Sequence, residues 1–102
     1  MIGDVLKRLR VIYGYKAYEM SKMLNISPSY LSEIENGKKQ PSLDHLKQYA
    51  EIFGIKLSSL ILLSESYEEA EKDGKGAALI RTMMMSLIAG MSKSSDALNE
   101  EN

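Results

Sequence analysis

The sequence contains no cysteine, and His45 is its only histidine. Without cysteine the chain can form no disulfide, no thiolate nucleophile and no cysteine-ligated zinc site, and this composition suits a reducing compartment. A single histidine also excludes most clusters of metal ligands. The sequence therefore predicts neither a metal site nor a bound cofactor, and it predicts that His45 lies at the surface of a helix.

Long hydrophobic runs are also missing. The longest apolar stretch, 77–91, has only 15 residues and contains Arg81, whereas a membrane-spanning helix needs about 20 apolar residues. At the N-terminus, charged residues are mixed into the apolar run, unlike in a secretory signal. No nucleophile–base pair, paired carboxylates or glycine-rich phosphate loop is recognisable, so an enzyme is the least favoured class. These absences predict a soluble cytoplasmic protein without a membrane partner.

Net charge is small as well, at −1, but it is unevenly distributed. Residues 1–63 contain nine Lys and Arg against six Asp and Glu, whereas residues 64–102 contain four against eight. The small total argues against an extensive nucleic-acid surface, while the mildly basic first part permits a local DNA contact. The asymmetry indicates two surfaces with different roles.

Hydrophobic periodicity predicts an all-α protein, because apolar residues recur at helical spacing and no segment alternates with a period of two. Capping residues and glycines mark the helix ends. The first of five predicted helices begins at Ile2 and stops at Gly14, and the second is short, with Met20, Met23 and Leu24 inward. The third covers 28–36 between Ser27 and Gly37, the fourth runs from Ser42 to Gly54, and the fifth covers 57–63.

The composition changes after residue 63. Residues 64–76 predict either an acidic linker or a short helix, followed by a hinge at Gly74 and Gly76. Residues 77–91 predict an apolar oligomerisation helix, and 92–102 a frayed polar tail. The chain length fits one small domain over residues 1–63 with an appendage.

Two of the predicted helices meet the packing demands of a helix-turn-helix motif, whose second helix can enter the DNA major groove. The close crossing needs a small residue in the first helix, which is Ser21, and the turn needs Gly or Asn, which is Asn25. The apolar seam consists of Met20, Leu24, Ile26, Leu31 and Ile34. Another kind of compact helical hairpin would satisfy part of this pattern.

Residues 2–63 resemble the lambda-repressor-like, Xre-type (Cro/C1) helix-turn-helix family. The resemblance covers about 60 of the 102 residues. It is carried by the run Leu6-Lys7-Arg8-Leu9-Arg10, by residues 25–38 with their Ile34-Glu35-Asn36-Gly37-Lys38 run, by Pro41-Ser42-Leu43, and by Leu46, Ala50, Phe53 and Gly54. It implies a five-helix DNA-binding domain, to which this chain adds a C-terminal helix.

The resemblance also implies roles for individual residues. Glu35 matches a family glutamate that pairs inside the domain with the arginine matching Arg10. Glu33 matches a position aimed at base edges, where a carboxylate can accept a hydrogen bond from the cytosine amino group. The base-reading candidates are Ser29, Ser32 and Glu33, and the phosphate or backbone candidates are Arg10, Lys16, Lys22, Tyr30, Asn36, Lys38 and Lys39.

Each of these residues also has a purely structural interpretation. Ser29, Ser32 and Glu33 could belong to a solvated helix face, and Tyr30 could pack beside the fourth helix. Two positions depart from the family pattern, in which the second helix usually begins with Ser or Thr followed by Gln. Here those positions are Lys16 and Ala17. The side-chain cap is lost, and Lys16 would replace a geometric phosphate contact by a looser charge.

Residues 77–91 carry an apolar stripe with the spacing of a coiled-coil seam. Its members are Ile80, Met84, Leu87 and Met91, widened by Leu79, Met83 and Ile88. The stripe either folds back on the core or packs against a second copy of the chain. Dimerisation is favoured, because the five-helix unit can close without the stripe and Gly74 and Gly76 let the helix swing away. Methionines also suit an adaptable surface for a protein partner.

The favoured function is a homodimeric transcriptional regulator, most simply a repressor. It would place helix 28–36 of each subunit into successive major grooves of a palindromic operator in double-stranded DNA. An antitoxin whose C-terminal helix binds a toxin is a variant of this hypothesis. The alternative is a protein-interaction module with weak or no operator binding, which the negative net charge, Glu33 and the missing Ser–Gln pair support.

Overall fold

The computed structural model describes residues 2–82 and 85. Within them, all regular structure is helical. The five main helices are α1 (Ile2–Ile12), α2 (Ala17–Met23), α3 (Pro28–Glu35), α4 (Leu43–Phe53) and α5 (Leu57–Glu71). A further helical segment covers residues 76–82. The predicted all-α fold is thus confirmed for this part of the chain, in which no helix is long and apolar enough to cross a membrane.

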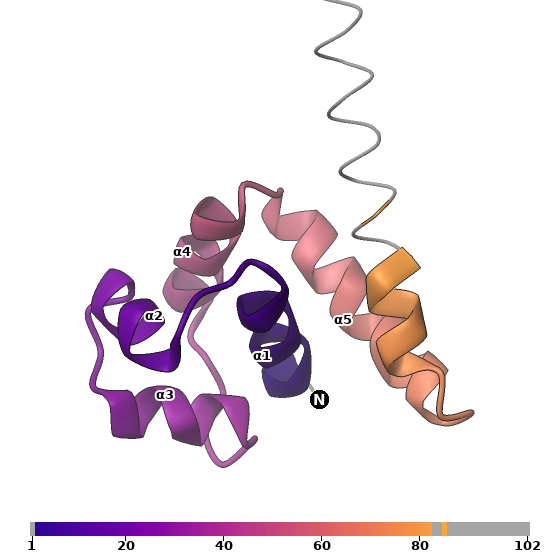
Figure 1. Cartoon of the computed structure of the whole chain (residues 1–102), viewed down its shortest axis with the longest axis horizontal. Helices are drawn as coiled ribbons and strands as arrows, with labels where there is room; N and C mark the ends of the chain where they lie inside the picture. Colours follow the sequence, from indigo (N-terminus) through magenta and orange to yellow (C-terminus); the bar gives the residue numbers. More distant parts are fainter. Residues whose placement is uncertain (1, 83–84, 86–102) are drawn as a thin grey trace, which may run out of the picture.

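Helix α1 lies at the centre of the molecule, between the α2–α3 pair and α5 (Figure 1). Its residues Val5, Leu6 and Leu9 are completely buried, because their spacing keeps them on the inward face of the helix. Gly3 permits a close crossing with α3, since a Cβ atom at this position would overlap the carbonyl oxygen of Ile34. Helix α3, which carries the predicted base-reading residues, therefore packs directly against α1.

Local signals define both ends of α3, as the sequence predicts. The Ser27 hydroxyl accepts a hydrogen bond from the backbone N–H of Tyr30 at 3.0 Å, which caps the first turn. After the helix, Gly37 has a φ of 78° in the left-handed region, where glycine pays no steric penalty. The chain therefore turns back sharply towards the end of α3.

Met23 does not face inward as predicted, and it is 43% exposed. The inward stripe of the short helix α2 is narrow, and Met20 and Ser21, together with Leu24 just after the helix, already occupy it. Met23 lies at the edge of that stripe, where its side chain reaches solvent. The correction concerns one position and leaves the α2–α3 seam intact.

Helix α5 is longer than the sequence predicts, because it continues past residue 63 to Glu71. Leu60, Leu63, Ser64 and Tyr67 are all buried, so the helical period of inward residues persists through the acidic stretch. The glutamates of this stretch are exposed. The structure therefore corrects the predicted end of the fifth helix, since the charged residues form the polar face of an amphipathic helix.

Tyr49 on α4 is a core residue that the sequence analysis did not single out. Its side chain is fully buried beside Phe53, with ring centroids 5.8 Å apart. Among the residues that the structure describes, its hydroxyl has no hydrogen-bond partner. Burial, reinforced by the nearby Glu35 carboxylate, raises the pKa of Tyr49 above the ordinary value of 10.0. The hydroxyl is thus a buried polar group whose desolvation is not offset.

The segment 76–82 folds back on the domain instead of swinging away. Ile80 is 1% exposed and belongs to the main core. Gly76 is buried, and its N–H donates to the Glu71 carboxylate at 3.1 Å. A Cβ atom on Gly76 would collide with the Tyr67 ring. This glycine therefore serves close packing against α5, which corrects its predicted role as a hinge.

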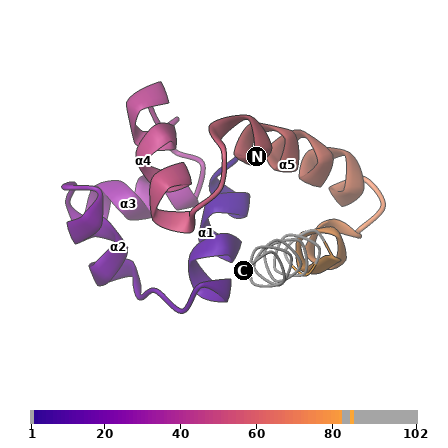
Figure 2. The same ribbon diagram turned by 90° about the horizontal axis from the view of Figure 1, so that it is seen from above.

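The view from above shows α1 between the α2–α3–α4 group and the pair formed by α5 and segment 76–82 (Figure 2). Ile80 and the half-buried Leu79 are the members of the predicted dimer seam that the structure describes. For Ile80 the fold-back alternative holds, because its side chain packs on its own chain. The remaining members, Met83, Met84, Leu87, Ile88 and Met91, lie outside the described residues.

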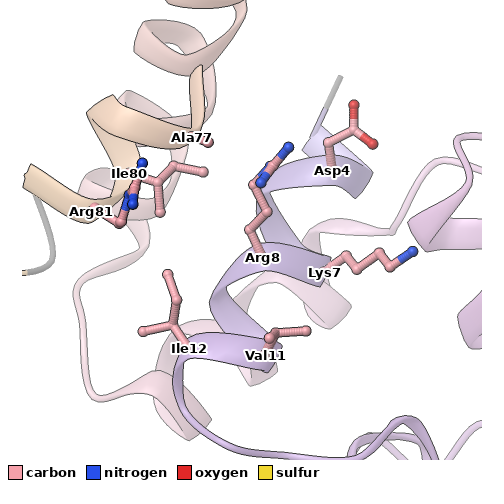
Figure 3. Close-up of a pocket in the computed structure, with 8 residues that line it drawn as sticks. All are labelled: Asp4, Lys7, Arg8, Val11, Ile12, Ala77, Ile80 and Arg81. Carbon is pink, nitrogen blue, oxygen red and sulfur yellow. The ribbon is translucent and has the colours of Figure 1, made fainter. Parts of the chain in front are cut away.

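A groove of about 520 Å³ remains between α1 and the segment 76–82. Figure 3 shows Ile80 and Ile12 pointing towards one another across it. Lys7, Arg8 and Arg81 contribute positive charge to its walls. Arg8 is also tied to α5, because its Nε donates to the Tyr67 hydroxyl at 3.3 Å. The groove thus separates segment 76–82 from α1, which is itself tied to α5 through Arg8.

Candidate nucleic-acid interface

Helices α2 and α3 form the predicted helix-turn-helix. Ser21 is 1% exposed at the crossing, where a larger side chain would separate the two helices. Asn25 has a φ of 57°, as the turn requires. The N–H of Ile26 donates to the carbonyl of Ser21 at 3.0 Å, which closes the turn against α2. The apolar seam is buried apart from Ile26, which is half-buried.

The outer face of α3 is polar. Ser29, Ser32 and Asn36 are exposed, Glu33 is half-exposed, and these positions repeat at helical spacing. The opposite face buries Leu31, Ile34 and Glu35. In Figure 1, α3 runs along one edge of the molecule, with α1 and α2 on its inner side. The three predicted base-reading residues, Ser29, Ser32 and Glu33, are therefore brought together on one accessible surface.

The inner face of α3 contains the ion pair implied by the family resemblance. The Arg10 guanidinium donates to both Glu35 carboxylate oxygens, at 2.8 Å and 3.1 Å. A third bond runs from Arg10 to the carbonyl of Tyr15 at 2.9 Å. Hydrogen bonding to the Glu35 carboxylate raises the pKa of Arg10 further above its ordinary value. Because Arg10 is only 9% exposed, its geometry argues against a direct phosphate contact.

Glu33 forms a second ion pair on the outer face of α3, which the sequence did not predict. Its carboxylate lies 3.6 Å from the Lys39 ammonium group. Lys39 also lies over the ring of Tyr30, 5.6 Å from the ring centroid. Tyr30 in turn meets His45 of α4 edge-on, with centroids 5.8 Å apart. Tyr30 therefore packs beside α4, the alternative considered from the sequence, and His45 is half-buried rather than fully at the surface.

The remaining residues predicted to contact phosphates lie on α2 and just after α3. Lys16, Lys22 and Lys38 are all exposed. The Lys22 ammonium lies over the Tyr18 ring at 4.6 Å from the centroid. The exposed Asn36 amide donates to the Ser32 hydroxyl at 3.2 Å. Lys16 and Lys22 thus belong to the start and the last turn of α2, whereas Asn36 and Lys38 follow α3.

The start of α2 has a cap that the sequence analysis missed. Lys16 offers no side-chain cap, but the Glu19 carboxylate accepts a hydrogen bond from the Lys16 backbone N–H at 2.9 Å. The spacing of three residues is that of one half of a capping box, a signal present in the sequence. Glu19 thus takes over part of the capping role of the missing Ser–Gln pair, and it adds a negative charge at the start of α2.

The chain matches one family model and is similar in sequence to known transcriptional regulators. The model of the family described as helix-turn-helix matches residues 6–60, more than half of the chain. The chain is 31% identical over 97 residues to the HTH-type transcriptional regulator SinR of Bacillus subtilis (strain 168), covering 91% of this chain and 83% of SinR. It is 36% identical over 62 residues to the transcriptional regulator ClgR of Mycobacterium tuberculosis (strain CDC 1551 / Oshkosh), covering 61% of this chain.

The chain spans only 55% of the length of ClgR. Among solved structures, the crystal structure of SinR, a master regulator for biofilm formation, in complex with DNA aligns with a TM-score of 0.54 and 29% identity. That alignment covers 60% of this chain and 98% of the solved chain.

Proposed function

Because the chain belongs to the helix-turn-helix family, we propose that it is a sequence-specific DNA-binding transcriptional regulator. In this proposal α3 enters the major groove and presents Ser29, Ser32 and Glu33 to base edges. The observation that carries the proposal is the exposed polar face of a helix whose opposite face is held in the core. An α-helix with its side chains is about 10–12 Å in diameter, which fits a major groove about 12 Å wide.

Phosphate contacts would come from the cations that flank α3. Lys22 lies on α2, Lys38 follows α3, and both side chains are exposed. Each cation that neutralises a phosphate releases condensed counterions, so these contacts supply affinity without sequence preference. Arg10 is left out of this set because its guanidinium is engaged by Glu35.

We further propose a homodimeric repressor acting at a palindromic operator. Occupying promoter DNA is sufficient for repression and needs no catalytic chemistry. The sequence after residue 82 continues with apolar residues, including Leu87 and Ile88, and these support a contact between two copies. The residues of segment 76–82 that pack on their own chain take no part in that contact. A two-fold dimer would place its two α3 helices about 34 Å apart, one turn of DNA.

Selection of bound sequences from a random duplex library, with the full chain at moderate salt, tests the proposal. We expect an enriched palindrome whose half-sites are centred about 10 bp apart. Lys38→Glu should weaken binding to the enriched duplex and to a scrambled duplex alike, because it reverses a charge beside the phosphates.

Two other outcomes would contradict part or all of the proposal. Enrichment of a single half-site would support sequence-specific binding and contradict the palindromic dimer. No enrichment by a folded protein would contradict sequence-specific binding and favour the protein-interaction module.

A further inference from the structure

Lys39 is held between two groups on the outer side of α3. Its ammonium nitrogen lies 3.6 Å from the Glu33 carboxylate and 5.6 Å from the centre of the Tyr30 ring. The carboxylate attracts the ammonium by charge, and the ring face attracts it through its quadrupole. The Tyr30 ring in turn packs edge-on against the ring of His45 on α4. Lys39 thus occupies a defined position although its side chain is 56% exposed.

The backbone brings Lys39 to the same place. The carbonyl of Glu33 accepts hydrogen bonds from the N–H of Lys38 at 2.8 Å and from the N–H of Lys39 at 3.2 Å. The left-handed Gly37 makes this return possible. The backbone of the loop that carries Lys39 is therefore hydrogen-bonded to Glu33, the same residue whose carboxylate the Lys39 side chain contacts. The pairing does not depend on a long flexible side chain alone.

We propose that Lys39 is a positioning residue that sets the base preference of Glu33, an inference that rests on the proposed DNA-binding function. A carboxylate alone on this face would be repelled by the DNA phosphates and would sample several rotamers. The Lys39 ammonium offsets that charge and restricts the carboxylate, so Glu33 enters the groove already oriented. An exposed amino group on a base, such as that of cytosine, is the matching partner.

Lys38 provides a matched control. It has the same charge, lies in the same loop one residue earlier and is exposed. Within the part of the chain that the structure describes, no ion pair joins its ammonium to Glu33. Lys38 should therefore act only as a phosphate contact, whereas Lys39 should act through Glu33.

The test is selection from a random duplex library with the full chain and five variants: Lys38→Ala, Lys39→Ala, Lys39→Arg, Glu33→Ala and the double variant Glu33→Ala/Lys39→Ala. We expect Lys39→Ala to reduce the base preference about twofold, a ratio that one exposed charge pair supports. The reduction should fall at the same base position that Glu33→Ala alters. Lys39→Arg should keep the preference, because arginine retains the charge and can stack on the ring.

The control and the double variant separate positioning from simple charge. Lys38→Ala should lower affinity for all sequences and leave the preference unchanged. In the Glu33→Ala background, removing Lys39 should have no further effect on the preference. The inference is overturned if Lys39→Ala has the same profile as Lys38→Ala, or if Lys39→Ala shifts the preference equally with and without Glu33.

Failure of the inference is distinguishable from failure of the proposed function. If the wild-type chain selects an operator but Glu33→Ala changes no base preference, the inference fails and the DNA-binding proposal stands. If the wild-type chain selects no sequence, the DNA-binding proposal fails and the inference falls with it. The thermal unfolding midpoint of each variant, measured by circular dichroism, shows whether it is folded during selection.

Discussion

Replacing Glu35 by glutamine should lower the free energy of unfolding by about 3 kcal/mol. The Glu35 carboxylate is the counter-charge of a buried guanidinium, and the side chains of Arg10 and Glu35 are only 11% and 7% exposed. Breaking such a buried pair costs about 3–5 kcal/mol, mainly because the remaining charge is left uncompensated. Glutamine keeps the shape and one acceptor oxygen, and Arg10 keeps its bond to Tyr15, so we expect the lower end of this range.

Urea unfolding of the full chain at pH 7, followed by far-ultraviolet circular dichroism, measures this loss. Glu33→Gln removes a charge from the same helix at an exposed position, and it should change the free energy of unfolding by less than about 0.5 kcal/mol. A double variant, Arg10→Met with Glu35→Leu, should recover most of the loss, because an apolar pair of similar volume leaves no buried charge.

The reasoning would be refuted by a loss below about 1 kcal/mol in Glu35→Gln, since the charge pair would then contribute no more than a neutral hydrogen bond. An equal loss in Glu33→Gln would also refute it.

Three further substitutions and one control variant test the packing by thermal and urea unfolding. Tyr49→Phe removes a buried hydroxyl without a partner, so the free energy of unfolding at pH 7 should stay unchanged or rise by about 1 kcal/mol, and a clear loss would reveal a hydrogen bond. Because burial raises the pKa of Tyr49 in the folded state, its titration leaves the free energy of unfolding unchanged below the unfolded pKa of 10.0. As pH rises above 10.0, the free energy of unfolding falls, since the unfolded state loses the proton first. The Tyr49→Phe variant should therefore lose less stability than the wild type above pH 10.0. Gly3→Ala should lower stability by about 1–3 kcal/mol through overpacking, despite the better helix propensity of alanine, and an unchanged midpoint would contradict the close α1–α3 crossing. Ile80→Ala should cost about 2–4 kcal/mol, whereas Met85→Ala, at a 71% exposed position, should have no effect; equal midpoints would contradict the packing of segment 76–82 on the domain.

The features that the sequence predicted correctly are mostly local. The cap at Ser27 and the turns at Asn25 and Gly37 depend on one residue and its immediate neighbours, so their chemistry can be recognised from the letters alone. The pairing of Arg10 with Glu35 spans 25 residues, and no periodicity could reveal it. The family resemblance supplied that expectation.

The features that the sequence did not predict depend on tertiary geometry. The contact of Lys39 with Glu33 requires the return of the chain after α3, and charge pattern alone cannot distinguish Lys39 from Lys38. The acidic residues after 63 have the composition of a linker, but the buried Tyr67 shows that they belong to a helix that covers the core. Ile80 fits a dimer seam by spacing and packs on its own chain, because spacing specifies a face and not its partner.

The separation of α3 into an inner and an outer face has a consequence for how such a protein can diversify. Glu35 and Leu31 are committed to the fold, whereas Ser29 and Ser32 are exposed and take no part in the core. Substitutions at exposed positions usually change the free energy of unfolding by less than about 0.5 kcal/mol. Many combinations of outward side chains are therefore accessible by successive point mutations, each passing through a folded intermediate. A lineage carrying this scaffold can acquire a new binding preference without first evolving additional stability.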